Sequence, residues 1–253
     1  MKNLYYKLHK IVCSSWDKVN VGFKLNKRIL DILVVSIILM FIVSLLGVVC
    51  FIGQSNQKVI RVACVGDSLT QLSEYCYDLM VVLGDGYDVR NFGVSSTTVT
   101  LTSGFSYMDT TAFQDALDFE PDIVVIMLGT NDAHVGFFPS SSNFVDDYLT
   151  LVRAFQEFSS NPKIWLVLPP PIFSDQLGLI SPKYFEQTIL PSITQVANEA
   201  NLSVIDVYSL LIDYPEYFPD GLHPTMTVDN LGDEPAAQII AAAIYAAITS
   251  PME

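Results

Sequence analysis

Cysteine and histidine are scarce in this chain, and their scarcity limits the chemistry that it can perform. Among 253 residues there are four cysteines and three histidines. Cys13 and Cys50 belong to the N-terminal part of the chain, which leaves Cys64 and Cys76 as candidates for ordinary buried apolar positions. The sequence contains neither a disulfide framework nor the ligand spacing of a metal site, so we expect no metal and no cofactor.

Positive charge is also scarce after residue 57. Residues 58–253 contain six basic and 25 acidic side chains, whereas residues 1–28 contain seven basic side chains and one acidic one. A domain this acidic would repel the phosphates of nucleic acids and of anionic lipid headgroups. The composition therefore excludes a nucleic-acid partner and favours a neutral or cationic substrate.

A long apolar run separates these two regions. Residues 32–52 contain no charged side chain, and a helix of that length rises roughly 31 Å, which matches the hydrocarbon core of a bilayer. We expect a transmembrane helix here; the alternatives are a buried core helix, a cleaved signal peptide and a lipoprotein site at Cys50. The basic residues before it predict a cytoplasmic N-terminus. The predicted organisation is a single-pass protein of the cell membrane, with a cytoplasmic segment 1–31, an anchor 32–52, a linker 53–58 and an extracellular domain 59–253.

Short apolar runs alternate with amphipathic stretches along this domain. Such apolar runs are typical of a parallel sheet that is covered on both faces. The pattern predicts an α/β fold: a doubly wound, five-stranded parallel sheet in a three-layer α/β/α sandwich. The predicted strands are 59–65, 87–92, 122–128, 163–168 and 202–205, and the predicted helices are 75–83, 111–119, 143–158, 183–201 and 235–248.

Chemically distinctive residues follow the ends of the first three predicted strands. Gly66-Asp67-Ser68 follows the first strand, Gly93 the second, and Gly129-Thr130-Asn131-Asp132 the third. Open parallel sheets bind their ligands beyond the carboxyl ends of the strands. We therefore expect these residues to meet at one rim of the sheet.

Ser68 is the candidate nucleophile of this rim. A serine hydroxyl attacks at neutral pH only when an imidazole takes its proton and a carboxylate orients that imidazole. His223 is the candidate base, and Asp220, three residues before it, can reach its Nδ1 proton within one turn. The structural alternatives are a helix N-cap at Ser68 and a surface turn at Asp220, and His134 is the alternative base.

Four short sequence motifs, which follow one another in the order found in a known family, give the chain a resemblance to that family over about residues 58–250. These motifs are called blocks below. The chain resembles the SGNH hydrolases of the GDSL lipase and esterase superfamily, and most of all the sialate O-acetylesterase-like branch. That resemblance implies a serine esterase whose oxyanion hole consists of the backbone N–H groups of Ser68 and Gly93 and the side-chain amide of Asn131. The blocks are Gly66-Asp67-Ser68, Asn91-Phe92-Gly93, Gly129-Thr130-Asn131-Asp132 and Asp220-Gly221-Leu222-His223-Pro224.

The sequence departs from the family pattern at three places. Gln71 and the pair Ser95-Ser96 stand where the family commonly has glycine or Ser-Gly, and residues 225–234 are inserted before the last helix. A serine in place of glycine would narrow the groove or tilt an oxyanion donor, and the insertion would reshape the acyl pocket. No catalytic group is lost, so we expect activity.

The sequence indicates the type of reaction more directly than it indicates the substrate. A sugar ester, a lipid ester and a thioester all present the same carbonyl, and the resemblance, the lack of a lid-like insertion and the predicted extracellular location favour an O-acetyl ester of a carbohydrate. The alternative enzyme is a lysophospholipase or short-chain lipid esterase. The alternative from another class is a membrane-tethered glycan-binding module without turnover.

Overall fold

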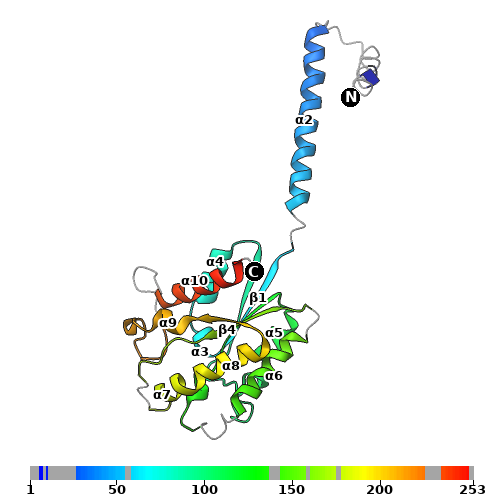
Figure 1. Cartoon of the computed structure of the whole chain (residues 1–253). Helices are drawn as coiled ribbons and strands as arrows, with labels where there is room; N and C mark the ends of the chain where they lie inside the picture. Colours follow the sequence, from blue (N-terminus) through cyan, green and yellow to red (C-terminus); the bar gives the residue numbers. More distant parts are fainter. Residues whose placement is uncertain are drawn as a thin grey trace. The chain divides into compact units, whose positions relative to one another are not determined.

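The protein consists of two compact units, which are described separately below. They are Met1–Gln57 and Lys58–Glu253 (Figure 1). The computed structural model describes residues 6–7, 10, 27–54, 58–136, 143–157, 160–174, 178–225 and 235–250. The predicted insertion therefore lies outside the described residues, apart from Thr225.

The first unit contains one long helix, α2 (Lys27–Gln54), which includes the whole apolar run. Side chains are described for residues 28–29 and 31–45 of this helix. Within the part of the chain that the structure describes, no helix is long and apolar enough to cross a membrane. The helix predicted over 32–52 therefore forms, but its role as a transmembrane segment is not supported by the structure.

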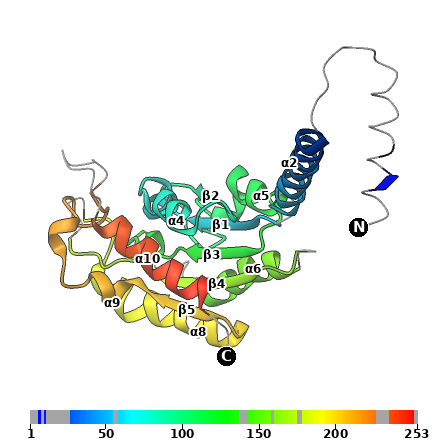
Figure 2. The ribbon, with the colours of Figure 1, turned by 90° about the horizontal axis from the view of Figure 1, so that it is seen from above.

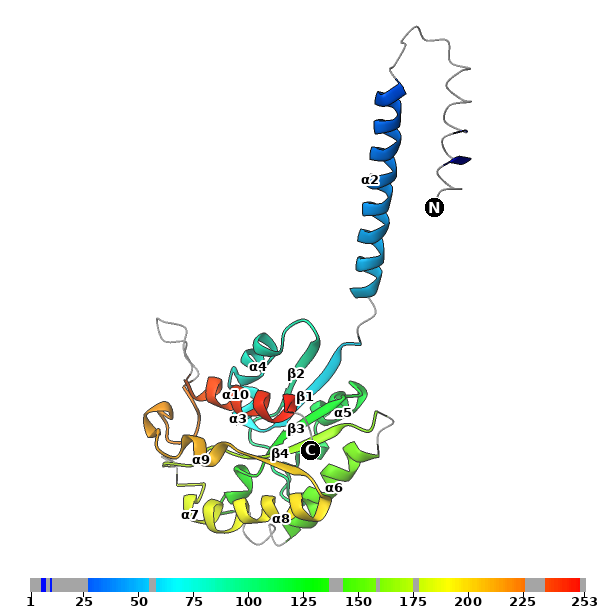
Figure 3. The same cartoon turned by 45° about the horizontal axis from the view of Figure 1, so that its top comes forward.

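The second unit is built on a five-stranded sheet in which every neighbouring pair of strands is parallel. The strand order is β2-β1-β3-β4-β5; Figure 3 labels the first four of these strands and Figure 2 labels all five. The apolar run of the central strand β3 is buried along its whole length, as the sequence predicts. The strands are β1 (Ile60–Gly66), β2 (Tyr87–Gly93), β3 (Ile123–Met127), β4 (Lys163–Leu168) and β5 (Ser203–Asp206).

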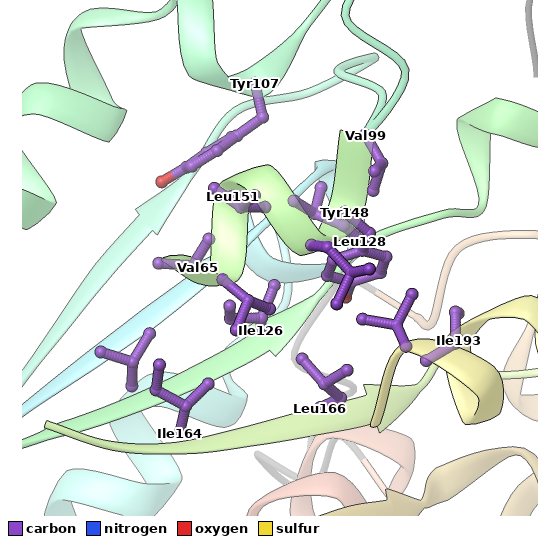
Figure 4. Close-up of a cluster of buried hydrophobic side chains, with 14 of the residues drawn as sticks. Val65, Val99, Tyr107, Ile126, Leu128, Tyr148, Leu151, Ile164, Leu166 and Ile193 are labelled. Carbon is purple, nitrogen blue, oxygen red and sulfur yellow. The ribbon is translucent and has the colours of Figure 1, made fainter. Parts of the chain in front are cut away.

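Helices cover both faces of this sheet, which confirms the predicted three-layer arrangement. Because successive strand residues point to opposite faces, the sheet contributes to two separate apolar cores. Val65 and Ile126 pack with Tyr148 and Ile193 in the core under α5, α6 and α8 (Figure 4). The other core lies under α4, α9 and α10, of which α4 and α10 pack side by side (Figure 2). These helices are α4 (Tyr75–Leu83), α5 (Thr111–Asp118), α6 (Phe144–Gln156), α8 (Leu190–Ala200), α9 (Val207–Leu211) and α10 (Pro235–Thr249).

The helix predicted over 183–201 is interrupted in the structure. It consists of the single turn α7 (Pro182–Tyr184), a π-helical segment over Phe185–Ile189, and α8. Pro191 lies in the first turn of α8, and proline removes a backbone donor and crowds the carbonyl four residues earlier. The wider π-helical turn just before α8 makes room for Pro191, which cannot donate a backbone hydrogen bond.

Candidate active site

Ser68 lies at the tight turn between β1 and the short helix α3 (Ser68–Gln71). Asp67 caps this helix, because its carboxylate accepts a hydrogen bond from the backbone N–H of Leu69 at 2.9 Å. The turn requires glycine at position 66, where an added Cβ would lie 2.8 Å from the carbonyl oxygen of Met127. The local sequence thus fixes the Ser68 side chain at the carboxyl end of the sheet, where it is 9% exposed.

Ser68, His223 and Asp220 form one hydrogen-bonded line. The Oγ of Ser68 lies 2.9 Å from Nε2 of His223, and Nδ1 of His223 lies 2.7 Å from Oδ2 of Asp220. A neutral imidazole that donates its Nδ1 proton to the carboxylate keeps Nε2 free to accept the serine proton. The structure therefore brings together the three groups that the sequence predicts as nucleophile, base and orienting acid.

Asp220 is held in its ionised form by its neighbours. Burial alone would raise its pKa, but hydrogen bonds from the His223 ring and from the backbone N–H groups of His223 and Leu222 outweigh burial and lower it. The carboxylate can therefore orient the imidazole and stabilise its protonated form at neutral pH.

The turn that carries Asp220 and His223 is anchored through Gly221. This residue has φ +81°, a left-handed conformation that favours glycine. Its carbonyl accepts hydrogen bonds from the backbone N–H groups of Phe173 and Ser174, at 2.8 and 3.2 Å. The acid and the base are thus tied to the segment that follows β4.

The two predicted oxyanion donors outside Ser68 differ in their surroundings. Asn131 begins a 3-10 turn after β3 (Asn131–Ala133), and its Nδ2 donates to the carbonyl of Thr97 at 3.0 Å and, at 3.3 Å, to the carboxylate of Asp67. Gly93 instead donates its N–H to Oδ1 of Asn91 at 2.9 Å. An added Cβ at Gly93 would lie 2.9 Å from the Cα of Gln71, so this glycine allows close packing of β2 against α3.

Ser96 presents a backbone donor that the sequence analysis missed. It has φ +65° and lines the same cavity as Ser68 and Asn131, whereas Gly93 does not line that cavity. Within the described residues, no hydrogen bond occupies the N–H of Ser96. At the wall of this cavity the structure therefore places the N–H of Ser96, whereas the N–H of Gly93 is hydrogen-bonded to Asn91. The position was marked in the sequence only as a serine where the family has glycine.

Gln71 and the pair Ser95-Ser96, which both differ from the family pattern, are in contact with each other. Oε1 of Gln71 accepts hydrogen bonds from the backbone N–H of Ser95, at 2.8 Å, and from its hydroxyl, at 2.6 Å. Because Gln71 ends the helix that Ser68 begins, the turn after β2 is connected to the nucleophile's own helix.

Two buried carboxyl groups lie behind the nucleophile. Burial raises the pKa of Asp67 to about 7, with a further contribution from the nearby charge of Asp132. Burial also raises the pKa of Asp132, to about 6, against hydrogen bonds from Thr100 and the backbone of Val99. Through these hydrogen bonds Asp132 holds the loop that follows the Ser95-Ser96 turn in place.

A cavity of about 650 Å³ opens in front of Ser68. One part of its wall is polar and contains the line from Ser68 to His223, and the other part is apolar. His134, the alternative base, lies in this wall with its Nδ1 accepting from the N–H of Gly136 at 3.0 Å. The lining residues are Ser68, Leu72, Ser95, Ser96, Phe105, Asn131, His134, Leu179, Ile180, Leu222 and His223. No cluster of three or more potential metal ligands occurs among the described residues.

Comparison with solved structures finds the same fold in several esterases. A carbohydrate acetylesterase from Sinorhizobium meliloti is 18% identical, with a TM-score of 0.58, over 75% of this chain and 98% of that chain. The acetyl xylan esterase AlAXEase is 18% identical, with a TM-score of 0.59, over 75% of this chain and 100% of that chain. An M. smegmatis aryl esterase is 18% identical, with a TM-score of 0.60, over 77% of this chain and 100% of that chain. At this identity the likeness shows the fold.

Sequence comparison gives the family. An acetylxylan esterase of Xylanibacter ruminicola is 35% identical over 215 residues, which cover 75% of this chain and 44% of that protein. The present chain thus spans less than half of the length of this relative. None of these matches singles out the sialate O-acetylesterase-like branch. The model of the GDSL-like lipase/acylhydrolase family matches residues 64–227. The chain therefore belongs to the GDSL-like lipase/acylhydrolase family, a family of carboxylic ester hydrolases.

Proposed function

We propose that this domain is a serine esterase that removes small acyl groups, foremost acetyl, from carbohydrates. The observation that carries the proposal is the hydrogen-bonded line from Ser68 Oγ through His223 to Asp220, at 2.9 and 2.7 Å, at the wall of a cavity. The similarity to an acetylxylan esterase supports the acetyl group and the carbohydrate.

The first half of the reaction acylates Ser68. His223 Nε2 takes the hydroxyl proton while Oγ attacks the ester carbonyl, and the C=O electron pair moves onto the oxygen. When the tetrahedral intermediate collapses, the same imidazole returns the proton to the departing alkoxide. Water then repeats both steps on the acyl-enzyme, which releases the carboxylic acid and restores Ser68.

The negative oxygen of the intermediate needs donors that are already in place. The backbone N–H groups of Ser68 and Ser96 and the side-chain amide of Asn131 supply them in this proposal. Asn131 has one proton in a long, 3.3 Å hydrogen bond to Asp67. That N–H can donate a hydrogen bond to the oxyanion in place of Asp67, while the 3.0 Å hydrogen bond to Thr97 keeps the amide in position.

A second candidate function is a short-chain lipid esterase or lysophospholipase. Leu72, Phe105 and Leu179 form an exposed apolar part of the cavity wall, and a volume of about 650 Å³ exceeds what an acetyl group fills. Such a wall can hold either an acyl chain or the apolar face of a sugar ring.

Substrate comparison with the purified full chain separates these candidates. We expect faster turnover of p-nitrophenyl acetate than of the octanoate, and release of acetate from acetylated xylo-oligosaccharides but little hydrolysis of lysophospholipid. The Ser68→Ala variant is the control. Preference for octanoate and lysophospholipid would support the lipid esterase, and equal activity of wild type and Ser68→Ala would contradict the whole proposal. A protein that binds acetylated glycans without releasing acetate would be the non-catalytic module.

We also propose that the domain acts outside the cell, at the membrane surface. The support comes from the sequence: the basic residues in 1–31 are followed by the uncharged residues 32–52. Protease added to intact cells should degrade the domain, and the full chain should stay in the membrane fraction during carbonate extraction. Protection from protease until lysis would contradict this location.

A further inference from the structure

The backbone donor of Ser96 depends on a turn whose conformation is costly for serine. Residues other than glycine rarely adopt a φ near +65°, and they keep it only where surrounding contacts hold them. The side chain of Ser96 is exposed, so packing against the protein core does not supply that restraint.

Hydrogen bonds hold both flanks of this turn. Before it, the N–H of Val94 donates to the carbonyl of Gly66 at 2.9 Å. After it, the carbonyl of Thr97 accepts from Nδ2 of Asn131 at 3.0 Å. The turn is also closed by the N–H and the hydroxyl of Thr97, which both donate to the carbonyl of Val94, at 3.4 and 2.7 Å. These bonds fix residues 94 and 97, but none of them is made by a group of Ser95 or Ser96.

The side chain of Gln71 adds an anchor on Ser95 itself. Within the described residues, the hydrogen bonds donated by the backbone and side chain of Ser95 both go to Oε1 of Gln71, at 2.8 and 2.6 Å. A single oxygen thereby restrains the residue next to Ser96. Because Gln71 is on the same short helix as Ser68, the anchor also relates the turn to the nucleophile.

We propose that Gln71 is a positioning residue: it holds the Ser95-Ser96 turn so that the Ser96 N–H points at the oxygen that becomes negative in the transition state. The inference rests on the proposed esterase function and refines its oxyanion hole. It explains why two departures from the family pattern occur together. A serine in a left-handed position needs an anchor that glycine does not need.

Loss of this anchor should affect the transition state more than substrate binding. A hydrogen bond from the N–H of Ser96 stabilises the substrate most strongly when negative charge develops on the carbonyl oxygen. Loosening of the donor, rather than its removal, should therefore lower kcat by about tenfold and change KM by less than about twofold.

The test uses the full chain, p-nitrophenyl acetate, four single variants and one double variant. Gln71→Met keeps the length of the side chain but removes the acceptor. Ser95→Ala removes one of the two hydrogen bonds and should lower kcat by about threefold. Gln195→Met is the matched control, because Gln195 is also exposed and hydrogen-bonded through its side-chain amide, to Glu199 at 2.8 Å, but on α8. Gln195→Met should keep the wild-type kcat.

Ser96→Gly provides the discriminating measurement. Glycine adopts a positive φ without strain, so Gln71→Met in the Ser96→Gly background should lose less than about threefold in kcat relative to Ser96→Gly alone. A purely structural role of Gln71 would give the same loss in both backgrounds.

The outcomes separate this inference from the proposed function. A wild-type protein that hydrolyses no ester would contradict the function itself. An active wild type whose Gln71→Met variant keeps the wild-type kcat, or loses only substrate affinity, would overturn the inference alone. Should Gln71→Met fail to fold by circular dichroism, Ser95→Ala decides, and a wild-type kcat in that variant overturns the inference.

Discussion

Replacement of Gly221 by alanine should damage both folding and catalysis, because this glycine combines a left-handed conformation with a close backbone approach. At φ +81° an L-residue costs roughly 1–2 kcal/mol. An added Cβ would also lie 2.6 Å from the carbonyl oxygen and 2.8 Å from the nitrogen of Ser174. Since these are backbone atoms, the segments must move apart.

That movement breaks the two hydrogen bonds that Gly221 accepts from Phe173 and Ser174. At about 1 kcal/mol each, their loss adds to the strain, and we expect Gly221→Ala to lower the free energy of unfolding by roughly 3–4 kcal/mol. A shift of about 1 Å in the adjacent acid and base should lower kcat/KM by on the order of 100-fold.

Gly84→Ala is the matched control for this experiment. Gly84 has φ +72° and ψ −169°, a conformation that is essentially restricted to glycine, but an added Cβ there would meet nothing within 4 Å. Its cost should therefore be the backbone strain alone, roughly 1–3 kcal/mol. Urea unfolding measures stability, and p-nitrophenyl acetate hydrolysis measures activity. A Gly221→Ala protein that is as stable as Gly84→Ala and keeps the wild-type kcat/KM would show that the close backbone approach at Gly221 has no such effect.

The triad, the buried carboxyl group and the domain boundary each give a further prediction. Ser68→Ala or His223→Ala should lower kcat by roughly 10⁴-fold or more in steady-state assays, and Asp220→Asn by less, since the triad acts as a unit. Because the folded-state pKa of Asp67 is raised to about 7, the folded protein binds this proton more tightly than the unfolded chain. Its contribution to stability is therefore present below about pH 4 and declines as pH rises to about 7. Asp67→Asn, which keeps a capping oxygen, should show a smaller decline in urea unfolding over this range, and an unchanged pH profile would contradict the assignment. Residues 58–253 expressed alone should keep the kcat of the full chain, because this range forms one compact unit that holds every site residue; a large loss would show that the first unit contributes to the site.

The sheet was predictable from the sequence because its strands are buried on both faces. Continuous apolar runs such as residues 123–127 have few other stable arrangements. The break before Leu190 was harder to predict, although Pro191 was visible within the predicted helix. Proline tolerates the first turn of a helix and disrupts its interior, and periodicity alone does not say where a new first turn begins.

The site was predictable where side chains carry the chemistry and unpredictable where the backbone does. The types and order of Ser68, Asp220 and His223 predict a site, and the structure places these three side chains in one hydrogen-bonded line. The sequence does not predict the N–H of Ser96 as a candidate donor, because its place at the cavity depends on a backbone angle. The bonds from Ser95 to Gln71 were equally hidden, since they join residues 24 positions apart in the chain.

Covalent labelling tests whether Ser68 is a nucleophile that His223 activates. Diisopropyl fluorophosphate forms an Oγ–P bond with an activated serine and releases fluoride as the P–F bond breaks. Peptide mass mapping of the labelled full chain should place the label on Ser68, with no label in Ser68→Ala and far slower labelling in His223→Ala. Absence of label in the wild-type protein, label on another serine, or an unchanged rate in His223→Ala would contradict the account.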